Sequence, residues 1–367
     1  MTWKKVILGD IVTLQRGYDL PEQDRRPGQF SVVGSAGPNG FHNKANVSGP
    51  GVVVGRSGAG FGTAHFCEAD FWALNTGLFV SDFRGNDPYF VYYLLDYLDF
   101  TKYNSGGAQP SLNRNFIYPI PVTLPPLAEQ TRIARMLSTW DLAIEKKEQL
   151  IEAKERWFSW LLKRLITSDK HPRRHIRDFT TEVSKRNSGG VIDRVLSVTN
   201  NRGFVLPEDQ FERRVASSNL NNYKIITRGQ YAYNPSRINV GSIARLYSWE
   251  KGVLSPMYVV FRLNEKKVNN DFFLHWLSSH EAKERIRKSA QGSVRETVSF
   301  TDLVAIPFPL PPLEQQQQIA TTLNIARQEI DLLKKQSEAY LKQKRGLMQK
   351  LLSGQWQLKN GEEVENG

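Results

Sequence analysis

Apolar residues recur at alternating steps of four and three in two separate stretches, the spacing of a helix that packs one face against a partner helix. In the first stretch they are Ile133, Leu137, Trp140, Ile144, Ile151, Phe158, Leu161 and Leu165. In the second they are Ile319, Leu323, Ala326, Ile330, Leu333, Tyr340, Leu347 and Leu351. Polar residues interrupt these two seams at Lys147, Lys154, Ser337 and Lys344. The pattern predicts two long helices, each with an apolar stripe that needs a partner.

The two stretches are copies of one another, because residues 120–169 and 306–355 align without a gap at an offset of 306 − 120 = 186 residues. Each copy contains a Pro-Pro pair, which suits the start of a helix, and then has no proline or glycine for about thirty residues. Roughly forty helical residues at 1.5 Å each span about 60 Å. Either stretch could form an ordinary amphipathic core helix, but the matching stripe in the same chain favours an intramolecular coiled coil.

The globular sequence around these helices also repeats, although more loosely. A strand is predicted at 78–80 and a buried helix at 88–100. Residues 241–244 and 270–279 correspond to 62–65 and 88–100. The predicted fold class is α+β, with two globular α/β domains joined by two long helices packed as an antiparallel coiled coil in a pseudo-two-fold internal repeat. The predicted segments are a first domain at 1–122, a long helix at 123–170, a second domain at 171–308, a long helix at 309–357 and a polar tail at 358–367.

The net charge is +12 over 367 residues, and most of the excess lies in one part of the chain. Residues 170–305 contain 23 Lys and Arg against 13 Asp and Glu, whereas residues 1–119 contain ten of each. The second domain is therefore expected to meet a polyanion, unless the protein is simply basic for solubility. No apolar run of eighteen residues and no signal-peptide core is present, so a cytoplasmic protein without membrane contact is predicted. The single cysteine, Cys67, excludes a disulfide framework.

Three stretches resemble catalytic or metal motifs without completing one. Gly55–Gly62 is rich in glycine, but Thr63 stands where a nucleotide or S-adenosylmethionine loop would need its third glycine. Tyr233–Ser236 lacks the second proline and the trailing aromatic of the Asn-Pro-Pro-aromatic motif of amino-methyltransferases. His171 and His175 are four residues apart, but the proline between them and the lack of a nearby Glu or Cys argue against zinc. We therefore expect no catalytic residues, cofactor or metal in this chain.

The two motif copies, Leu124–Gln130 and Leu310–Gln316, resemble the heads of the conserved regions in the specificity (S, HsdS) subunits of Type I restriction–modification systems. Two further stretches resemble the usual start of such subunits and a stretch common in their recognition domains: Trp3–Asp10 and Tyr233–Ser242. The second copy departs slightly, with Gln315 where the first has Glu129. The resemblance extends over nearly the whole chain.

This resemblance implies a DNA-binding subunit that directs the chemistry of other subunits and performs none itself. Each domain would be a target-recognition domain that reads one half of a bipartite site in double-stranded DNA, and the helical pair would set the spacer between the halves. Two methyltransferase (M) subunits and two restriction (R) subunits are the implied partners. S-adenosylmethionine, ATP and Mg²⁺ would bind to those partners, which supply the nuclease and the adenine methyltransferase activities.

Base reading requires side chains with paired donors and acceptors, and phosphate binding requires cations, hydroxyls or backbone amides. In the first domain such residues on glycine-flanked loops are Arg56, Ser57, Asn75, Asn104, Gln109, Asn113 and Arg114. In the second domain they are Asn234, Ser236, Arg237, Asn239, Gln291, Ser293 and Arg295. These are the predicted DNA contacts, although each residue could equally shape a turn.

Two other functions remain compatible with the sequence. A coiled-coil scaffold with two protein-binding heads would capture partners whose binding is insensitive to nuclease and salt. The DNA-specificity part of a self-contained methyltransferase–nuclease would require S-adenosylmethionine binding by this chain, for which no motif is present. A cofactor-binding assay on the isolated chain distinguishes the second of these from a specificity subunit.

Overall fold

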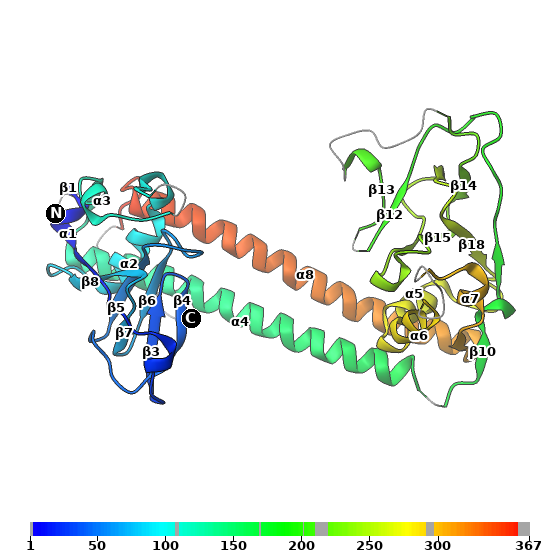
Figure 1. Ribbon diagram of the computed structural model, residues 1–367, viewed down its shortest axis with the longest axis horizontal. Coiled ribbons are helices and arrows are strands. Elements are labelled where there is room, and N and C mark those ends of the chain that lie inside the picture. The colour runs from blue at the N-terminus through cyan, green and yellow to red at the C-terminus, as the bar shows by residue number, and fades with distance from the viewer. Residues whose placement is uncertain are drawn as a thin grey trace. The chain divides into compact units, whose positions relative to one another are not determined.

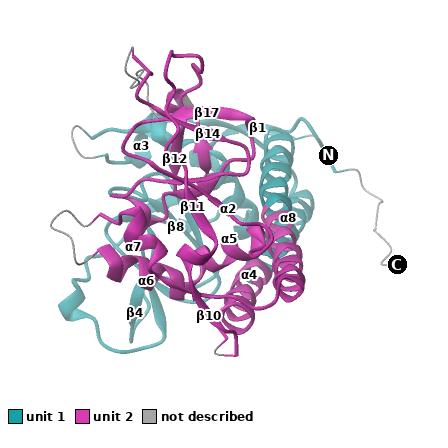
Figure 2. Ribbon diagram, turned by 90° about the vertical axis from the view of Figure 1, so that its right-hand side faces the viewer, with its two compact units in different colours: residues 1–149, 335–367 teal, residues 150–334 magenta. Residues whose placement is uncertain are grey.

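The computed structural model of the chain describes residues 3–106, 110–168, 170–200, 202–209, 219–290 and 297–358. The chain divides into two compact units, unit 1 from Met1–Gln149 with Lys335–Gly367 and unit 2 from Leu150–Lys334. Each unit contains a globular part and a stretch of both long helices (Figure 2).

Two long helices, α4 (Leu127–Leu165) and α8 (Leu313–Leu352), begin directly after the Pro-Pro pairs (Figure 1). They contain 39 and 40 residues and start 313 − 127 = 186 residues apart. In unit 1, Asp141 pairs with Lys344 at 2.5 Å and Lys147 with Gln336 at 3.1 Å, so the helices run antiparallel there. The prediction of two long helices packed against each other is confirmed.

All sixteen apolar seam residues are buried or partly buried, and so are the four polar interruptions. The three lysines among these interruptions have specific partners on the other helix. Lys344 binds Asp141 and its Nζ lies 5.3 Å above the ring centre of Tyr93, while Lys154 pairs with Glu329 at 2.6 Å. Each interruption is matched by an apolar residue at the equivalent position of the other copy, as Lys344 is by Phe158. The seam therefore keeps its packing although four of its positions are polar.

Unit 1 is built on an antiparallel sheet of order β2–β8–β5–β6. The strands of this sheet are β2 (Thr13–Arg16), β5 (Gly51–Gly55), β6 (Ala64–Cys67) and β8 (Gly77–Asp82). A second sheet of order β4–β3–β7 contains β3 (Phe30–Gly34), β4 (Gly37–His42) and β7 (Phe71–Ala73), and β1 (Lys4–Ile7) pairs with β9 (Pro121–Leu124). The helical elements are α1 (Leu8–Ile11), η1 (Glu22–Asp24), α2 (Pro88–Tyr97), η2 (Phe100–Tyr103) and α3 (Arg114–Ile117).

Unit 2 is built on an antiparallel sheet of order β11–β18–β15–β16. The strands of this sheet are β11 (Thr180–Glu182), β15 (Tyr231–Tyr233), β16 (Ile243–Arg245) and β18 (Val259–Leu263). The paired strands around it are β10 (Arg173–His175) with β19 (Pro307–Pro309), β12 (Ser197–Thr199) with β13 (Gly203–Val205), and β14 (Lys224–Thr227) with β17 (Lys251–Leu254). The helical elements are η3 (Ile176–Asp178), η4 (Pro207–Asp209), η5 (Ile238–Val240), α5 (Asn270–Ser278), α6 (His280–Ala290) and α7 (Phe300–Val304).

The two main sheets therefore follow the same plan, with β11, β18, β15 and β16 in the places of β2, β8, β5 and β6. The predicted correspondence of 241–244 with 62–65 is confirmed, since β16 and β6 begin within these stretches. The predicted helices at 88–100 and 270–279 are α2 and α5. Sequence analysis did not predict α6, which follows α5 where unit 1 has the short η2.

The core of each unit is completed by apolar residues from both long helices. In unit 1, Leu137 of α4 and Leu351 of α8 are buried in one cluster with Leu94 of α2. In unit 2, Phe158 of α4 and Leu323 of α8 are buried with the aromatic side chains of α5. The largest core cluster of each unit therefore includes residues of both long helices, and burial of this shared apolar surface stabilises the globular parts.

A buried glutamine in each motif copy fixes the start of a long helix to the adjacent domain helix. Gln130 donates to the carbonyl of Pro125 at 3.0 Å and accepts from the amide of Asp87 at 3.0 Å. Gln316 makes the equivalent bonds to Pro311 at 2.8 Å and Asn269 at 2.8 Å. Since Asp87 and Asn269 cap the N-termini of α2 and α5, one side chain links the long helix to the domain in each unit.

One of the two differences between the motif copies, Glu129 against Gln315, has a structural reason. Glu129 is buried and accepts from the indole of Trp3 at 2.9 Å and from the amide of Leu358 at 2.8 Å. Its carboxylate thereby holds the segments before β1 and after α8 against the head of α4. Gln315, at the equivalent position of unit 2, is exposed. A carboxylate is therefore useful only in the first copy, where two N–H donors meet it.

Replacing Gln316 by Ala is expected to destabilise the protein by roughly 2–4 kcal/mol, because the Asn269 amide and the carbonyls of Pro311 and Lys267 lose their partner in the interior. Urea unfolding followed by circular dichroism measures the loss. Gln317→Ala, at the exposed neighbouring position, is the matched control. Equal unfolding free energies for the two variants would contradict an anchoring role for Gln316.

Candidate nucleic-acid interface

A polar pocket of about 460 Å³ lies in unit 1 at the end of the β2–β8 ladder. The residues lining it are Gln15, Arg16, Arg56, Leu78, Ser105, Ser111, Leu112, Asn113 and Arg114. Three of the predicted DNA contacts, Arg56, Asn113 and Arg114, thus meet in one place although they are distant in the sequence. Gln15 and Arg16 were missed by sequence analysis, because nothing in a short strand indicates which of its residues ends at a pocket.

Backbone pairing brings these segments together. The amide of Leu112 donates to the carbonyl of Arg56 at 2.8 Å, and isolated β-bridges join Ser57 to Ser111 and Asn104 to Leu112. The loop that follows β5 is therefore held against the segment that leads into α3. This brings Ser57 and Asn104 beside the pocket as well.

Two of the three guanidinium groups in the pocket are held by backbone carbonyls. Arg56 Nη1 donates to the carbonyl of Asn75 at 3.1 Å, and Arg114 Nη1 donates to the carbonyl of Leu14 at 2.7 Å. Arg16 lies 3.8 Å from Asp19, and both of these side chains are largely exposed. The arginines are thus oriented by the fold rather than neutralised by buried acids.

The asparagines of unit 1 among the predicted contacts are engaged in shaping the loops. Asn104 Oδ1 accepts from the amides of Gly106 and Ser111, at 2.9 and 3.0 Å. Asn113 Oδ1 caps α3, and Asn75 donates to Asp19. Their amide groups are acceptors and donors that the local structure already uses.

In unit 2, four predicted contacts lie in the loop that follows β15. Asn234 is buried and its Oδ1 accepts from the amide of Ser236 at 3.0 Å, so it closes the turn. Ser236, Arg237 and Asn239 are exposed on that turn. The buried side chain of Ile238 anchors the turn in the core. The loop therefore presents polar side chains from a fixed base.

Four of the predicted contacts lie outside the described residues: Gln109, Gln291, Ser293 and Arg295.

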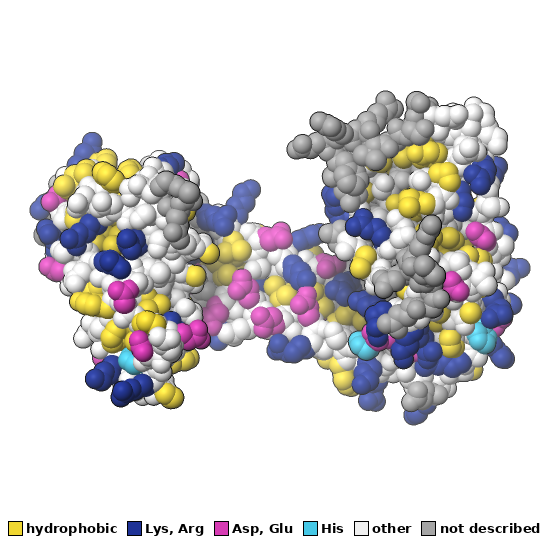
Figure 3. Space-filling model, in the orientation of Figure 1, with side chains coloured by type: hydrophobic (Ala, Val, Ile, Leu, Met, Phe, Trp, Pro, Cys, Tyr) yellow, Lys and Arg dark blue, Asp and Glu magenta, His cyan; other side chains and the backbone are white. Residues whose placement is uncertain are grey.

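Lys and Arg side chains gather on unit 2 around α6 (Figure 3). The helix buries Ala282, Ile286 and Ala290 at steps of four and exposes Arg287 and Lys288. This i, i+4, i+8 pattern in the sequence HEAKERIRKSA is the signal that could have predicted both the helix and its basic face.

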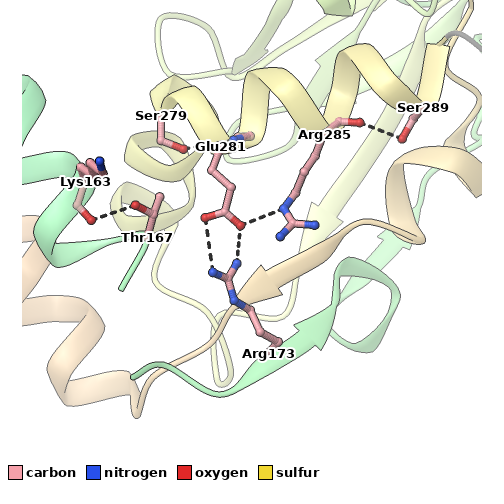
Figure 4. A network of polar contacts seen from close by, with 8 residues as sticks. Lys163, Thr167, Arg173, Ser279, Glu281, Arg285 and Ser289 are labelled. Carbon is pink, nitrogen blue, oxygen red and sulfur yellow. Dashed lines mark hydrogen bonds and ion pairs between the residues drawn. The ribbon is translucent and has the colours of Figure 1, made fainter. Parts of the chain in front are cut away.

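A charge network holds α6 to β10. Glu281 is contacted by both terminal nitrogens of Arg173 and accepts from Arg285 Nε at 2.8 Å (Figure 4). The network connects the basic stretch after α4 to the helix, and Glu281 is mostly buried, with 17% of its side chain exposed. Arg173 and Arg285 are therefore structural cations. Arg287 also pairs with Glu284 at 2.9 Å, but this contact lies at the surface, where ion pairs interact weakly.

The glycine-rich stretch and the histidine pair that resemble cofactor and metal motifs both have structural explanations. Gly55–Gly62 forms the turn between β5 and β6, in which Gly62 donates to the carbonyl of Gly55 at 2.8 Å. The left-handed backbone of Gly62, at φ 78°, explains that glycine. His171 is buried against the carbonyl of Leu165 and His175 is exposed.

No group of three or more metal-ligating side chains gathers within the described ranges. Among those same residues no helix is long and apolar enough to cross a membrane.

Comparison with known proteins gives one consistent result. A family described as Type I restriction modification DNA specificity domain matches residues 1–155 and 214–343. The chain is 26% identical over 308 residues to the type I restriction enzyme MjaX specificity subunit of Methanocaldococcus jannaschii, covering 74% of this chain and 69% of that protein. It is 23% identical over 308 residues to the MjaVIII specificity subunit of the same organism, covering 75% and 71%.

Two solved structures share the fold. The S subunit of the Type-I restriction-modification system from M. genitalium has a TM-score of 0.62 at 16% identity, covering 96% of each chain. A structure on complex assembly and conformational transition of the type I R-M system has a TM-score of 0.58 at 14% identity, covering 97% of this chain and 98% of that one.

Arg237→Ala is expected to weaken DNA binding by the chain assembled with methyltransferase subunits. Loss of one base or phosphate contact costs about 1–3 kcal/mol, which is roughly 5- to 150-fold in affinity. Fluorescence anisotropy over a salt series measures the change. The matched control is Arg228→Ala, an exposed arginine of the same unit that is paired with Glu250 at 2.8 Å. Unchanged affinity at every salt concentration would assign the loop after β15 to structure alone.

Proposed function

Because the chain belongs to the family of Type I restriction modification DNA specificity domains, we propose that each of its units reads one half of a bipartite DNA target. It is a DNA-specificity subunit of a Type I restriction–modification system, and subunits of this family are not catalytic within the complex.

The observation that carries the proposal is the repetition of one plan with different loops. Both main sheets have the same strand order, and both units use a buried glutamine to fix the long helix to the domain helix. The exposed polar surfaces differ, with an arginine-lined pocket in unit 1 and a loop beside a basic helix in unit 2. A fixed frame with two dissimilar surfaces suits two independent readers of sequence.

The methyltransferase and restriction activities would reside in partner subunits. We expect two M subunits and two R subunits to assemble with this chain on double-stranded DNA, carrying S-adenosylmethionine, ATP and Mg²⁺. α4 and α8 are the elements that we expect to set the spacer, since helices of 39 and 40 residues are each about 60 Å long. That length is close to two turns of DNA, at ~34–36 Å per turn. The cytoplasm, where cellular DNA lies, is the expected compartment.

Exchanging residues 1–119 for the first domain of a relative with another target should change one half of the methylated sequence and preserve the other half. The two readers are independent because each has its own sheet and loops. Methylome sequencing of a host that carries the hybrid system provides the test. The reciprocal control exchanges residues 178–305 and should change the opposite half. A hybrid in which both halves change together would argue against independent readers.

Inserting one heptad after Gln149 and another after Lys335, which are 335 − 149 = 186 residues apart, should lengthen the spacer without changing either half-site. Seven residues keep the seam in phase and add about 10.5 Å, or roughly three base pairs at ~3.4 Å each. Activity should fall, because three base pairs also rotate one half-site by about 100°.

The control for the heptad insertion adds five residues at the same points, which breaks the seam and should cost folding. Methylome sequencing distinguishes the outcomes. A methylated site that retains its original spacer would show that α4 and α8 do not set the distance.

A further inference from the structure

The charge of unit 1 poses a physical question for a DNA-reading domain. Residues 1–119 contain ten basic and ten acidic side chains, so the first domain as a whole exerts no net attraction on a polyanion. Contact with the DNA backbone usually contributes a large part of the affinity of such domains. Electrostatic attraction of phosphates to this domain therefore has to come from a local concentration of cations.

The pocket at the end of the β2–β8 ladder provides that concentration. Arg16 comes from β2, Arg56 from the loop after β5, and Arg114 from the first position of α3. Among the described residues that line the pocket there is no carboxylate. The neighbouring pocket of about 620 Å³ contains Asp19 and Glu22 beside its arginine, so it lacks this excess. The exposed Arg16–Asp19 contact at 3.8 Å neutralises little, because exposed pairs interact weakly.

We propose that Arg16, Arg56 and Arg114 form a phosphate-binding site that holds the DNA backbone at the half-site read by unit 1. This inference rests on the proposed function, and it assigns the pocket to the backbone rather than to a base.

The geometry favours phosphate over base reading. Arg56 and Arg114 each use one Nη1 on a backbone carbonyl, which fixes the guanidinium and limits how far it extends into a groove. The remaining N–H donors of a guanidinium suit two phosphate oxygens. A concave pocket of about 460 Å³ also surrounds a compact group better than it reaches the edge of a stacked base.

Unit 2 has a different arrangement for the same task. Its residues 170–305 carry a large basic excess, and exposed cations on α6 can attract DNA without a pocket. The two units would then differ in how binding responds to salt and to single substitutions. In unit 1 the loss of one arginine should lower the DNA affinity more, because fewer cations contact the phosphates.

The test uses the full chain assembled with its methyltransferase subunits, and a DNA duplex that contains the sequence methylated by the system. Arg16→Gln, Arg56→Gln and Arg114→Gln are compared with Arg84→Gln, an exposed arginine beside the opposite end of the β2–β8 ladder. Dissociation constants are measured over a salt series. Each pocket variant should lower the slope of log K against log salt by about 0.9 for each lost phosphate contact, whereas Arg84→Gln leaves it unchanged.

A second measurement identifies the phosphate. Duplexes with a single neutral methylphosphonate at successive positions of the first half-site are bound to wild-type and Arg56→Gln complexes. At one position the methylphosphonate should raise the dissociation constant of the wild-type complex but not raise that of the Arg56→Gln complex further. Such non-additivity indicates a direct contact between Arg56 and that phosphate. If Arg56→Gln or Arg114→Gln disturbs the loops, as circular dichroism would reveal, Arg16→Gln retains the backbone bonds and still provides the test.

The outcomes separate this inference from the function on which it rests. An unchanged salt slope with relaxed preference at one base pair would make the pocket a base reader and overturn the inference alone. Unchanged slope and unchanged preference in all three variants would remove the pocket from the interface. A wild-type complex that does not distinguish its target from other DNA would instead overturn the proposed function.

Discussion

The apolar seam between α4 and α8 is the interaction on which the rest of the structure depends. Each helix has a stripe that water disfavours, and the other helix of the same chain covers it. The ends of both helices also enter the cores of the two units, with Leu137 and Leu351 in one and Phe158 and Leu323 in the other. A substitution in the seam therefore affects the cores of both globular parts, whereas a substitution in a surface loop leaves these cores intact.

Each of the three lysines in the seam has a polar partner on the other helix. Lys344 is the clearest case, because Asp141 binds its ammonium group and the Tyr93 ring lies beside it. Burial and the hydrogen bond to Asp141 raise the pKa of Tyr93, so the hydroxyl remains a donor to that carboxylate. In unit 2 the equivalent joint is built from Arg327 above the Phe158 ring at 4.2 Å, with His275 bonded to Asn324 at 2.8 Å. The two units therefore have contacts between the long helices and the domain helix at equivalent positions, but the contacting side chains differ.

The buried helical frame and the exposed loops differ in how alike they are between the two units, which is compatible with the proposed division of recognition. The buried glutamines and the helix seam are nearly the same in the two copies, since every unit must join the same helical pair. The loops that end at the pocket of unit 1 and at the basic face of unit 2 carry no such requirement. Their charges differ accordingly, with cations concentrated in a pocket in one unit and spread along a helix in the other.

The sequence alone determined the long helices, the repeat and the family, because heptad spacing and a fixed offset are properties of residue order. It also indicated strands and helices such as β8 and α2, whose apolar patterns are local. It missed α6, whose small apolar residues give a weak periodic signal among many charges. Only the tertiary structure brought Arg16 beside Arg56 and Arg114. Likewise, only the structure showed that the Asn234 side chain accepts a hydrogen bond within a turn. These outcomes depend on backbone pairing between distant segments, and residue order does not specify which exposed side chains such pairing brings together.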